Sequence, residues 1–130
     1  IADTSADFFG NDNKPLGRTA TGIYCVYTNQ TPIPAIAKVG DTGMWYAGTC
    51  YTSSTKFTKV ATTQVSYVLE PNTDATAILK LVQKLTDNSG QTGIATAAYR
   101  VSTTGAVTRL TETASISDSG VRINLTMTYP

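Results

Sequence analysis

Two cysteines, Cys25 and Cys50, carry the most definite chemistry in this sequence. In an oxidising compartment they could form a disulfide that closes a loop of about 25 residues and stabilises the fold by roughly 3 kcal/mol. In a reducing compartment they would instead be two buried free thiols. We predict the disulfide, because the composition is typical of extracellular proteins. The start at Ile1 rather than Met also favours removal of an upstream signal or propeptide.

The chain contains no histidine, and this absence excludes the commonest catalytic designs. Histidine usually moves protons near neutral pH, activates Ser or Cys nucleophiles and binds metals. Neither a G-x-S-x-G elbow nor a glycine-rich phosphate loop occurs. The nine acidic residues lie mostly beside turn residues, where solvation or helix capping is expected. We therefore predict a non-enzymatic protein with no metal and no cofactor.

Two further groups of residues could contact other molecules. Trp45, Tyr46 and Tyr51 would form a ligand surface for a sugar or small molecule, unless they are ordinary core aromatics. Asn29 and Asn124 each begin an N-x-Thr sequon, so both are candidate glycosylation sites in a secreted protein. A chain this rich in Ser and Thr produces about two sequons by chance, so the sequons alone indicate nothing about location.

The basic residues do not form a patch in the sequence. Ten Lys and Arg residues are balanced by nine Asp and Glu, and the net charge is +1. If Arg100, Arg109 and Arg122 lined up on one face of a sheet, they could contact a phosphate backbone without reading the base sequence. No apolar run approaches the roughly 20 residues needed to cross a bilayer, so we expect no membrane span.

The elements that must position these residues are mainly strands. Threonine, of which the chain has 24, favours the pleated surface of a sheet. Residues 1–18 show the least regular pattern. Alternating or apolar runs bounded by Gly, Pro or Asn predict about seven strands. These runs cover residues 21–28, 35–39, 44–51, 56–70, 93–102, 106–116 and 121–129.

The last of these strands has the clearest alternation in the chain. Apolar side chains at every second position would form one buried row, opposite a polar row that includes Thr126 and Thr128. Such a strand would pack into the core or pair with a neighbouring subunit, and we name it the assembly strand. Its apolar residues are Val121, Ile123, Leu125, Met127 and Tyr129.

Residues 73–87 show a different period. Their apolar positions, spaced as one face of a helix, are Ile78, Leu79, Leu81, Val82 and Leu85. Asn72, Thr73 or Asp74 could cap the start of this helix, and Asn88-Ser89-Gly90 could end it. The sequence therefore predicts one amphipathic helix within a single β-rich domain that spans residues 1–130. That domain would be a β-sandwich or a curved antiparallel sheet.

The C-terminal stretch GVRINLTMTYP, residues 120–130, resembles the end of fimbrial subunits of the chaperone–usher type. In those subunits a Gly precedes an alternating strand with a penultimate aromatic residue, here Tyr129. Cys25 in an early strand and the threonine-rich, weakly charged composition also fit. The resemblance implies a pilin-like subunit that joins its neighbours by donor-strand addition.

A second resemblance involves residues 64–87, predicted as a strand followed by a helix. This arrangement is similar to the strand–helix unit of small RNA-phage coat subunits, which have about this length. It implies a capsid protein that contacts nucleic acid.

The leading hypothesis from the sequence is a structural subunit that self-assembles into a homopolymeric extracellular filament or pilus. A viral coat protein in a virion is the first alternative, and a secreted binding module is the second. Electron microscopy of the purified protein would separate filaments from closed shells.

Overall fold

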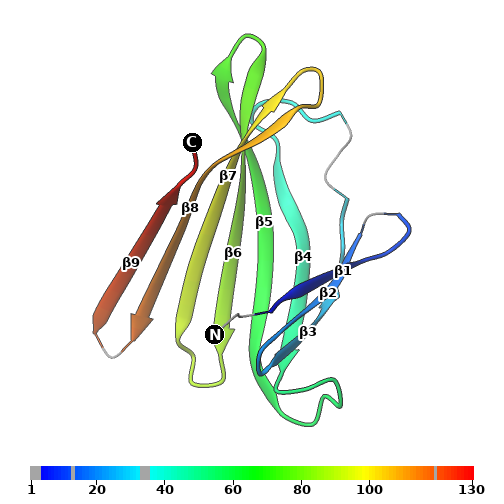
Figure 1. The fold of residues 1–130 in the computed structure, drawn as a ribbon, viewed down its shortest axis with the longest axis vertical. Helices are drawn as coiled ribbons and strands as arrows, with labels where there is room; N and C mark the ends of the chain where they lie inside the picture. Colours follow the sequence, from blue (N-terminus) through cyan, green and yellow to red (C-terminus); the bar gives the residue numbers. More distant parts are fainter. Residues whose placement is uncertain (1–3, 13, 33–35, 119) are drawn as a thin grey trace.

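The computed structural model describes residues 4–12, 14–32, 36–118 and 120–130, and the nine strands of that part of the chain form one antiparallel sheet (Figure 1). Each strand pairs with the strands before and after it in sequence, so β1 and β9 are the two edges. The strands are β1 (Ala6–Phe9), β2 (Pro15–Ala20), β3 (Ile23–Thr28), β4 (Thr42–Tyr51), β5 (Lys59–Thr73), β6 (Thr76–Asp87), β7 (Thr92–Ser102), β8 (Val107–Asp118) and β9 (Val121–Thr128).

The structure is β-rich, as the threonine content indicates, but the predicted architecture is wrong. The sheet is single and open rather than a sandwich, and it has nine strands instead of about seven. Residues 1–18, which showed the least regular pattern, contribute β1 and most of β2. Of the strand predicted at 35–39, residue 36 lies in a bend, residues 37–38 have no regular structure and residue 39 lies in a turn, while residue 35 lies outside the described residues.

The predicted helix at 73–87 is also wrong, because no helix occurs in the described residues and this stretch forms the end of β5, a turn and β6. Its apolar residues fit both periods. Leu79, Leu81 and Leu85 alternate along one face of β6, whereas Ile78 and Val82 lie on the other face. β6 pairs along its length with both β5 and β7. These long-range hydrogen bonds override the local helix preference.

The residues predicted to cap that helix build a hairpin turn instead. Thr73 pairs with Thr76 across the turn. The Asn72 side-chain amide donates a hydrogen bond to Thr76 Oγ1 at 2.8 Å, and the Ala75 amide donates to Thr73 Oγ1 at 3.3 Å. Asn and Thr side chains form such local bonds in turns as readily as at helix starts, so their presence alone does not distinguish the two.

The two faces of the sheet differ in polarity. Along β5, Ala61, Thr63, Val65 and Tyr67 are 2–6% exposed and share one face, which we call the apolar face. The Gln83 side-chain amide donates a hydrogen bond to Thr63 Oγ1 at 3.1 Å, so this buried hydroxyl is satisfied. The opposite face, which we call the polar face, includes the row of paired residues Gln64, Lys84, Ile94, Ser115 and Asn124.

The densest packing lies where β3, β4 and β5 meet on the apolar face. Cys25, Tyr27, Cys50 and Ala61 form the buried cluster. Tyr27 pairs with Gly48 of β4. A Cβ atom at Gly48 would lie 2.7 Å from Tyr27 Cδ1 and 2.8 Å from the backbone oxygen of Val26. Glycine therefore leaves the space that the tyrosine ring fills.

We expect Gly48→Ala to lower the free energy of unfolding by about 1–3 kcal/mol, because the added methyl group overpacks this site. Gly93→Ala is the matched control, since its Cβ would meet no atom closer than 3.8 Å. That substitution should be neutral or slightly stabilising. Chemical denaturation of both variants measures the difference, and equal stability of the two would contradict this account of Gly48.

Candidate assembly surface

The β8–β9 hairpin places the predicted assembly strand at the edge of the sheet. The two strands pair in regular register, and Ile116, Ala114 and Glu112 face Ile123, Leu125 and Met127, respectively. Gly120 in the connecting turn has φ +84°, a left-handed conformation that glycine adopts without strain. The predicted assembly residues of β9 therefore share the apolar face of the sheet.

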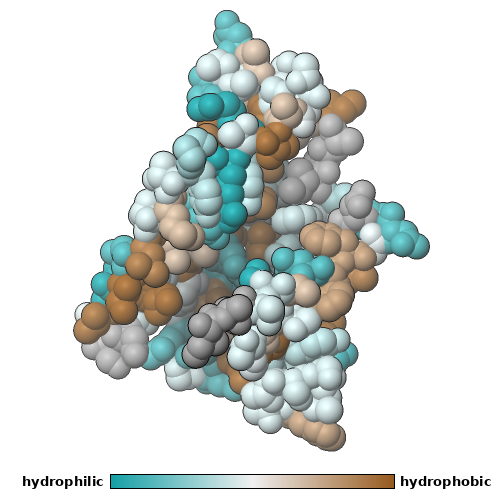
Figure 2. Space-filling view, viewed as in Figure 1, coloured by the Kyte–Doolittle hydropathy of each residue, from teal (hydrophilic) through white to brown (hydrophobic). Residues whose placement is uncertain are grey.

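These apolar side chains are exposed to solvent. The exposed fractions are 63% for Val121, 54% for Ile123, 62% for Leu125 and 53% for Met127. Figure 2 shows hydrophobic colour gathered over the β9 end of the molecule. The neighbouring part of this face carries small side chains, such as those of Ala95 on β7 and Ala114 on β8, which project little from the sheet. A second layer could therefore approach closely.

Among the described residues, no strand pairs with the outer edge of β9. The Tyr129 amide donates to the Leu110 carbonyl at 2.9 Å, and the β8–β9 register continues from this pair without a shift. In an antiparallel ladder, alternate residues direct both backbone groups toward the partner strand and the residues between them direct both groups outward. The outward set is Arg122, Asn124, Thr126 and Thr128. Their N–H and C=O groups form a template for another strand.

Tyr129 ends this surface in a polar cluster. Its hydroxyl donates to Glu112 Oε2 at 3.1 Å, and Arg109 Nη2 donates to the same oxygen at 2.6 Å. The Arg109 guanidinium also lies 4.5 Å from the centre of the Tyr129 ring, within the range of a cation–π contact. The β7–β8 register shifts next to this cluster, at Ala98 and Tyr99. The contacts explain why Glu112 interrupts the apolar row of β8.

The chain exposes more surface than a typical folded monomer of its mass. Its accessible area is 8627 Å², whereas a folded monomer of 13.8 kDa exposes about 6,600 Å². The excess of about 2,000 Å² is comparable to the area that one partner contributes to a large interface. The open sheet therefore leaves exposed an area that a compact domain of this mass would bury.

The predicted disulfide is present. Cys25 and Cys50 face each other across β3 and β4, with their Cα atoms 4.0 Å apart, and both side chains are buried on the apolar face. Disulfides are typical of proteins in oxidising compartments. In the described ranges there is no helix that could span a membrane, and no three acidic or cysteine side chains lie together as metal ligands would.

The three aromatic residues predicted to form a ligand surface are not all on one side. Tyr46 stacks on Tyr27, with ring centres 4.3 Å apart, and Trp45 meets Tyr46 edge-on at 5.1 Å. Tyr51 pairs with Tyr24 and lies on the polar face. Burial raises the pKa of Tyr46, and its contact with Tyr27 raises the pKa further. Tyr46 therefore acts as a core residue more than as a ligand contact.

The predicted glycosylation sites are both accessible. Asn29 follows β3 in a left-handed conformation with φ +54°, and its side chain is exposed. Asn124 is exposed on the polar face of β9. A glycan at Asn124 would lie beside the free edge and would obstruct strand addition there.

Two features of the surface were missed by sequence reasoning. Phe57, in the β4–β5 loop, is 92% exposed, but a single aromatic residue in a turn-rich stretch gives no periodic signal. A cavity formed by Leu69, Leu79 and neighbouring residues was missed because it depends on the β5–β6 pairing that the helix prediction excluded. Of the three arginines considered for phosphate contacts, Arg100 and Arg122 share the polar face. Arg109 lies on the apolar face, opposite Tyr99.

Comparison of the sequence with protein-family models and curated proteins, and of the fold with solved structures, gives no match.

We expect reduction of the Cys25–Cys50 disulfide to lower the free energy of unfolding by roughly 3 kcal/mol, because the unfolded chain regains the freedom of a loop of about 25 residues. Denaturation with and without reductant measures the change. Cys25→Ala/Cys50→Ala is the control and should be insensitive to reductant. A stability that reductant leaves unchanged in the native chain would contradict this expectation.

We also expect stability to decline at alkaline pH. Burial raises the pKa of both Tyr27 and Tyr46 above the ordinary value of about 10. Their contribution to stability is therefore complete below about pH 10 and is lost as pH rises through the higher pKa values of the folded state. Tyr46→Phe should show a smaller decline in denaturation experiments between about pH 8 and pH 12. An equal decline in both proteins would contradict this assignment.

Proposed function

We propose that the protein is a non-enzymatic structural subunit that associates with copies of itself, in an extracellular filament or pilus. The observation that carries this proposal is the exposed apolar strip of β9 beside an unpaired strand edge. A second copy that paired with β9 would satisfy the outward backbone groups of four residues, and its own side chains would pack against Ile123, Leu125 and Met127 on the same face. Strand addition combines main-chain hydrogen bonds with side-chain packing in this way.

Burying the apolar side chains of β9 would contribute substantially to the free energy of association. Fully burying a side chain of this size contributes about 1.5–3 kcal/mol, and these side chains are 53–63% exposed. Covering each one would therefore contribute on the order of 1 kcal/mol. Several such side chains on each of two copies are needed to offset the entropy lost on association. The excess exposed area of the subunit supports contacts on this scale.

The disulfide supports the extracellular part of the proposal. A buried Cys25–Cys50 bond persists in an oxidising compartment, where pili and other surface filaments are assembled. Self-association of this kind requires no catalysis, metal or bound cofactor. The function follows from shape, from an open edge and from exposed apolar side chains.

A viral coat protein is the second candidate, and the polar face provides the observation that favours it. Lys84, Arg100 and Arg122 lie on this face, and none has an acidic partner in the described part of the chain. Lys80 is on the same face but pairs with Glu70, at 2.7 Å. Cations on one side of a sheet could contact phosphate groups while the apolar face joins subunits.

We expect the purified protein to associate at concentrations below about 100 µM, and Leu125→Asn/Met127→Asn to weaken that association at least about tenfold. Because both side chains are exposed in the subunit, thermal stability of the variant monomer should change little. Thr113→Asn, on the polar face of β8, is the matched control and should associate normally. Sedimentation and electron microscopy report the assemblies.

The outcomes separate the candidates. Filaments support the pilus-like subunit, whereas closed shells whose absorbance spectrum shows nucleic acid support the coat protein. A wild-type protein that stays monomeric across this concentration range would refute both. Association that is unchanged in the double variant would show that β9 is not the contact.

A further inference from the structure

Phe57 is the most exposed large apolar side chain within the described ranges. It lies in the loop of residues 52–58 between β4 and β5, and 92% of it is accessible to solvent. The loop is well organised by hydrogen bonds. Thr52 N donates to the Thr58 carbonyl at 3.0 Å, and Lys56 N donates to the Ser53 carbonyl at 3.1 Å. Phe57 is therefore held outward by a defined loop.

The residue before it adds a local conformational constraint. Lys56 has φ +59°, a left-handed conformation that is uncommon and unfavourable for a residue with a side chain. Ser53 Oγ and Thr55 Oγ1 lie 2.7 Å apart and share a hydrogen bond within the same loop. Unfavourable backbone angles of this kind cluster at functional sites, and this one lies directly before the exposed Phe57 ring.

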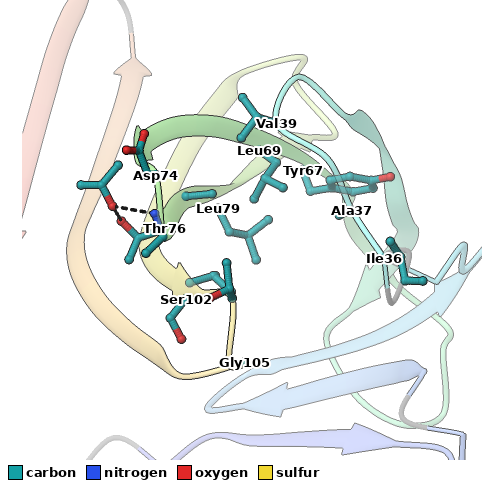
Figure 3. Close-up of a pocket in the computed structure, with 15 residues that line it drawn as sticks. Ile36, Ala37, Val39, Tyr67, Leu69, Asp74, Thr76, Leu79, Ser102 and Gly105 are labelled. Atoms are coloured by element: carbon teal, nitrogen blue, oxygen red, sulfur yellow. Dashed lines mark hydrogen bonds between the residues drawn. The ribbon is translucent and has the colours of Figure 1, made fainter.

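An apolar cavity lies at the opposite end of the sheet. Its volume is about 540 Å³, and Leu69 of β5 and Leu79 of β6 form part of its lining (Figure 3). The exposed side chains of Ile36 and Val39 border it, and Asp74 lies at the tip of the β5–β6 hairpin. A cavity of about 150 Å³ lined by apolar side chains already holds a benzene molecule. The space is therefore ample for a phenyl ring.

The chain direction fixes the relation between the loop and the cavity. β4 begins and β5 ends beside the cavity, whereas β4 ends and β5 begins at the loop that carries Phe57. Figure 1 shows these two ends of the long central strands far apart along the longest axis of the molecule. Phe57 cannot reach the cavity of its own chain, but it can reach the cavity of a copy placed end to end.

The charges at the two ends are complementary. Lys56 precedes Phe57, and neither Lys56 nor Asp74 has an ion-pair partner within the described residues. Asp74 lines the cavity. A ring entering from a neighbouring copy would bring the Lys56 ammonium group toward the Asp74 carboxylate. The same docking would thus place opposite charges together at its margin.

We propose that Phe57 of one copy inserts into the cavity of the next copy, with Lys56 facing Asp74 of that copy. This inference rests on the proposed self-assembly and names a second contact for it. The contact joins two different surfaces, so it is head-to-tail, and repeated contacts of this kind produce a filament or a ring. It runs along the strands, whereas pairing at β9 runs across them.

The test uses three single variants of the whole chain. Phe57→Ala should weaken end-to-end association by roughly 10- to 100-fold, because a buried phenyl ring is lost. Its own folding should be unaffected, since the ring is exposed in the subunit. Lys56→Glu and Asp74→Lys should each weaken association by about fivefold, because a like-charged pair replaces the opposite pair.

Mixing the two charge variants gives the sharpest result. Alone, Lys56→Glu brings two carboxylates together and Asp74→Lys brings two ammonium groups together, so each should associate poorly. In a mixture, every contact between unlike copies again joins opposite charges, so association should return to about the wild-type level. Thr55→Glu mixed with Asp74→Lys is a control for nonspecific charge attraction. Recovery in the Lys56→Glu mixture should exceed recovery in this control.

Each outcome decides between the proposals. Wild-type protein that stays monomeric overturns the self-assembly proposal and this inference together. Association that Phe57→Ala leaves unchanged overturns the Phe57 contact and leaves the β9 contact standing. A small apolar molecule found in the cavity by native mass spectrometry, with no effect of Phe57→Ala, would identify the cavity as a ligand site and would also overturn this contact.

Discussion

The hydrogen-bonded ladder between neighbouring strands is the constraint on which the rest of the structure depends. Because every described strand pairs only with the strands next to it in sequence, the described residues form one sheet with no second layer. A sheet of this kind buries side chains only where its own curvature and bulky residues cover it. Burial is greatest around the Cys25–Cys50 disulfide and along the apolar face of β5. It decreases toward β9, where all eight residues are exposed.

The two proposed contacts use different parts of that sheet and do not compete. The edge of β9 lies parallel to the strands, so a copy added there extends the sheet sideways. Phe57 and the cavity lie at the two ends of β4 and β5, so a copy added there extends the assembly along the strands. A subunit with both contacts could join neighbours in two directions. The two edges of the sheet also differ in length, because β1 has four residues and β9 has eight. The β9 edge therefore has more backbone groups with which another strand could pair.

The sequence predicted the features that depend on alternation over short distances. The apolar side chains of Val121, Ile123, Leu125 and Met127 lie on one face, as their alternation predicts, but that face is exposed at β9, so the predicted buried row is wrong. The two cysteines were also paired correctly, since the chain offers no other partner. The helix prediction failed because Leu79, Leu81 and Leu85 fit a strand as well as a helix, and only pairing with β5 and β7 decides between them. The cavity could not be predicted without that pairing, and Phe57 has no pattern around it.

The order of the strands also has a consequence for how the molecule folds. Contacts between consecutive strands need only short loops to close, so folding can proceed strand by strand without the slow search that distant pairings require. During synthesis the chain emerges from its N-terminal end, and domains fold as their sequence becomes available. Of the nine described strands, β9 emerges last. Until β9 emerges, β8 is the exposed edge of the sheet. Another chain that pairs at that stage would therefore bind β8 instead of β9, the strand exposed in the complete sheet.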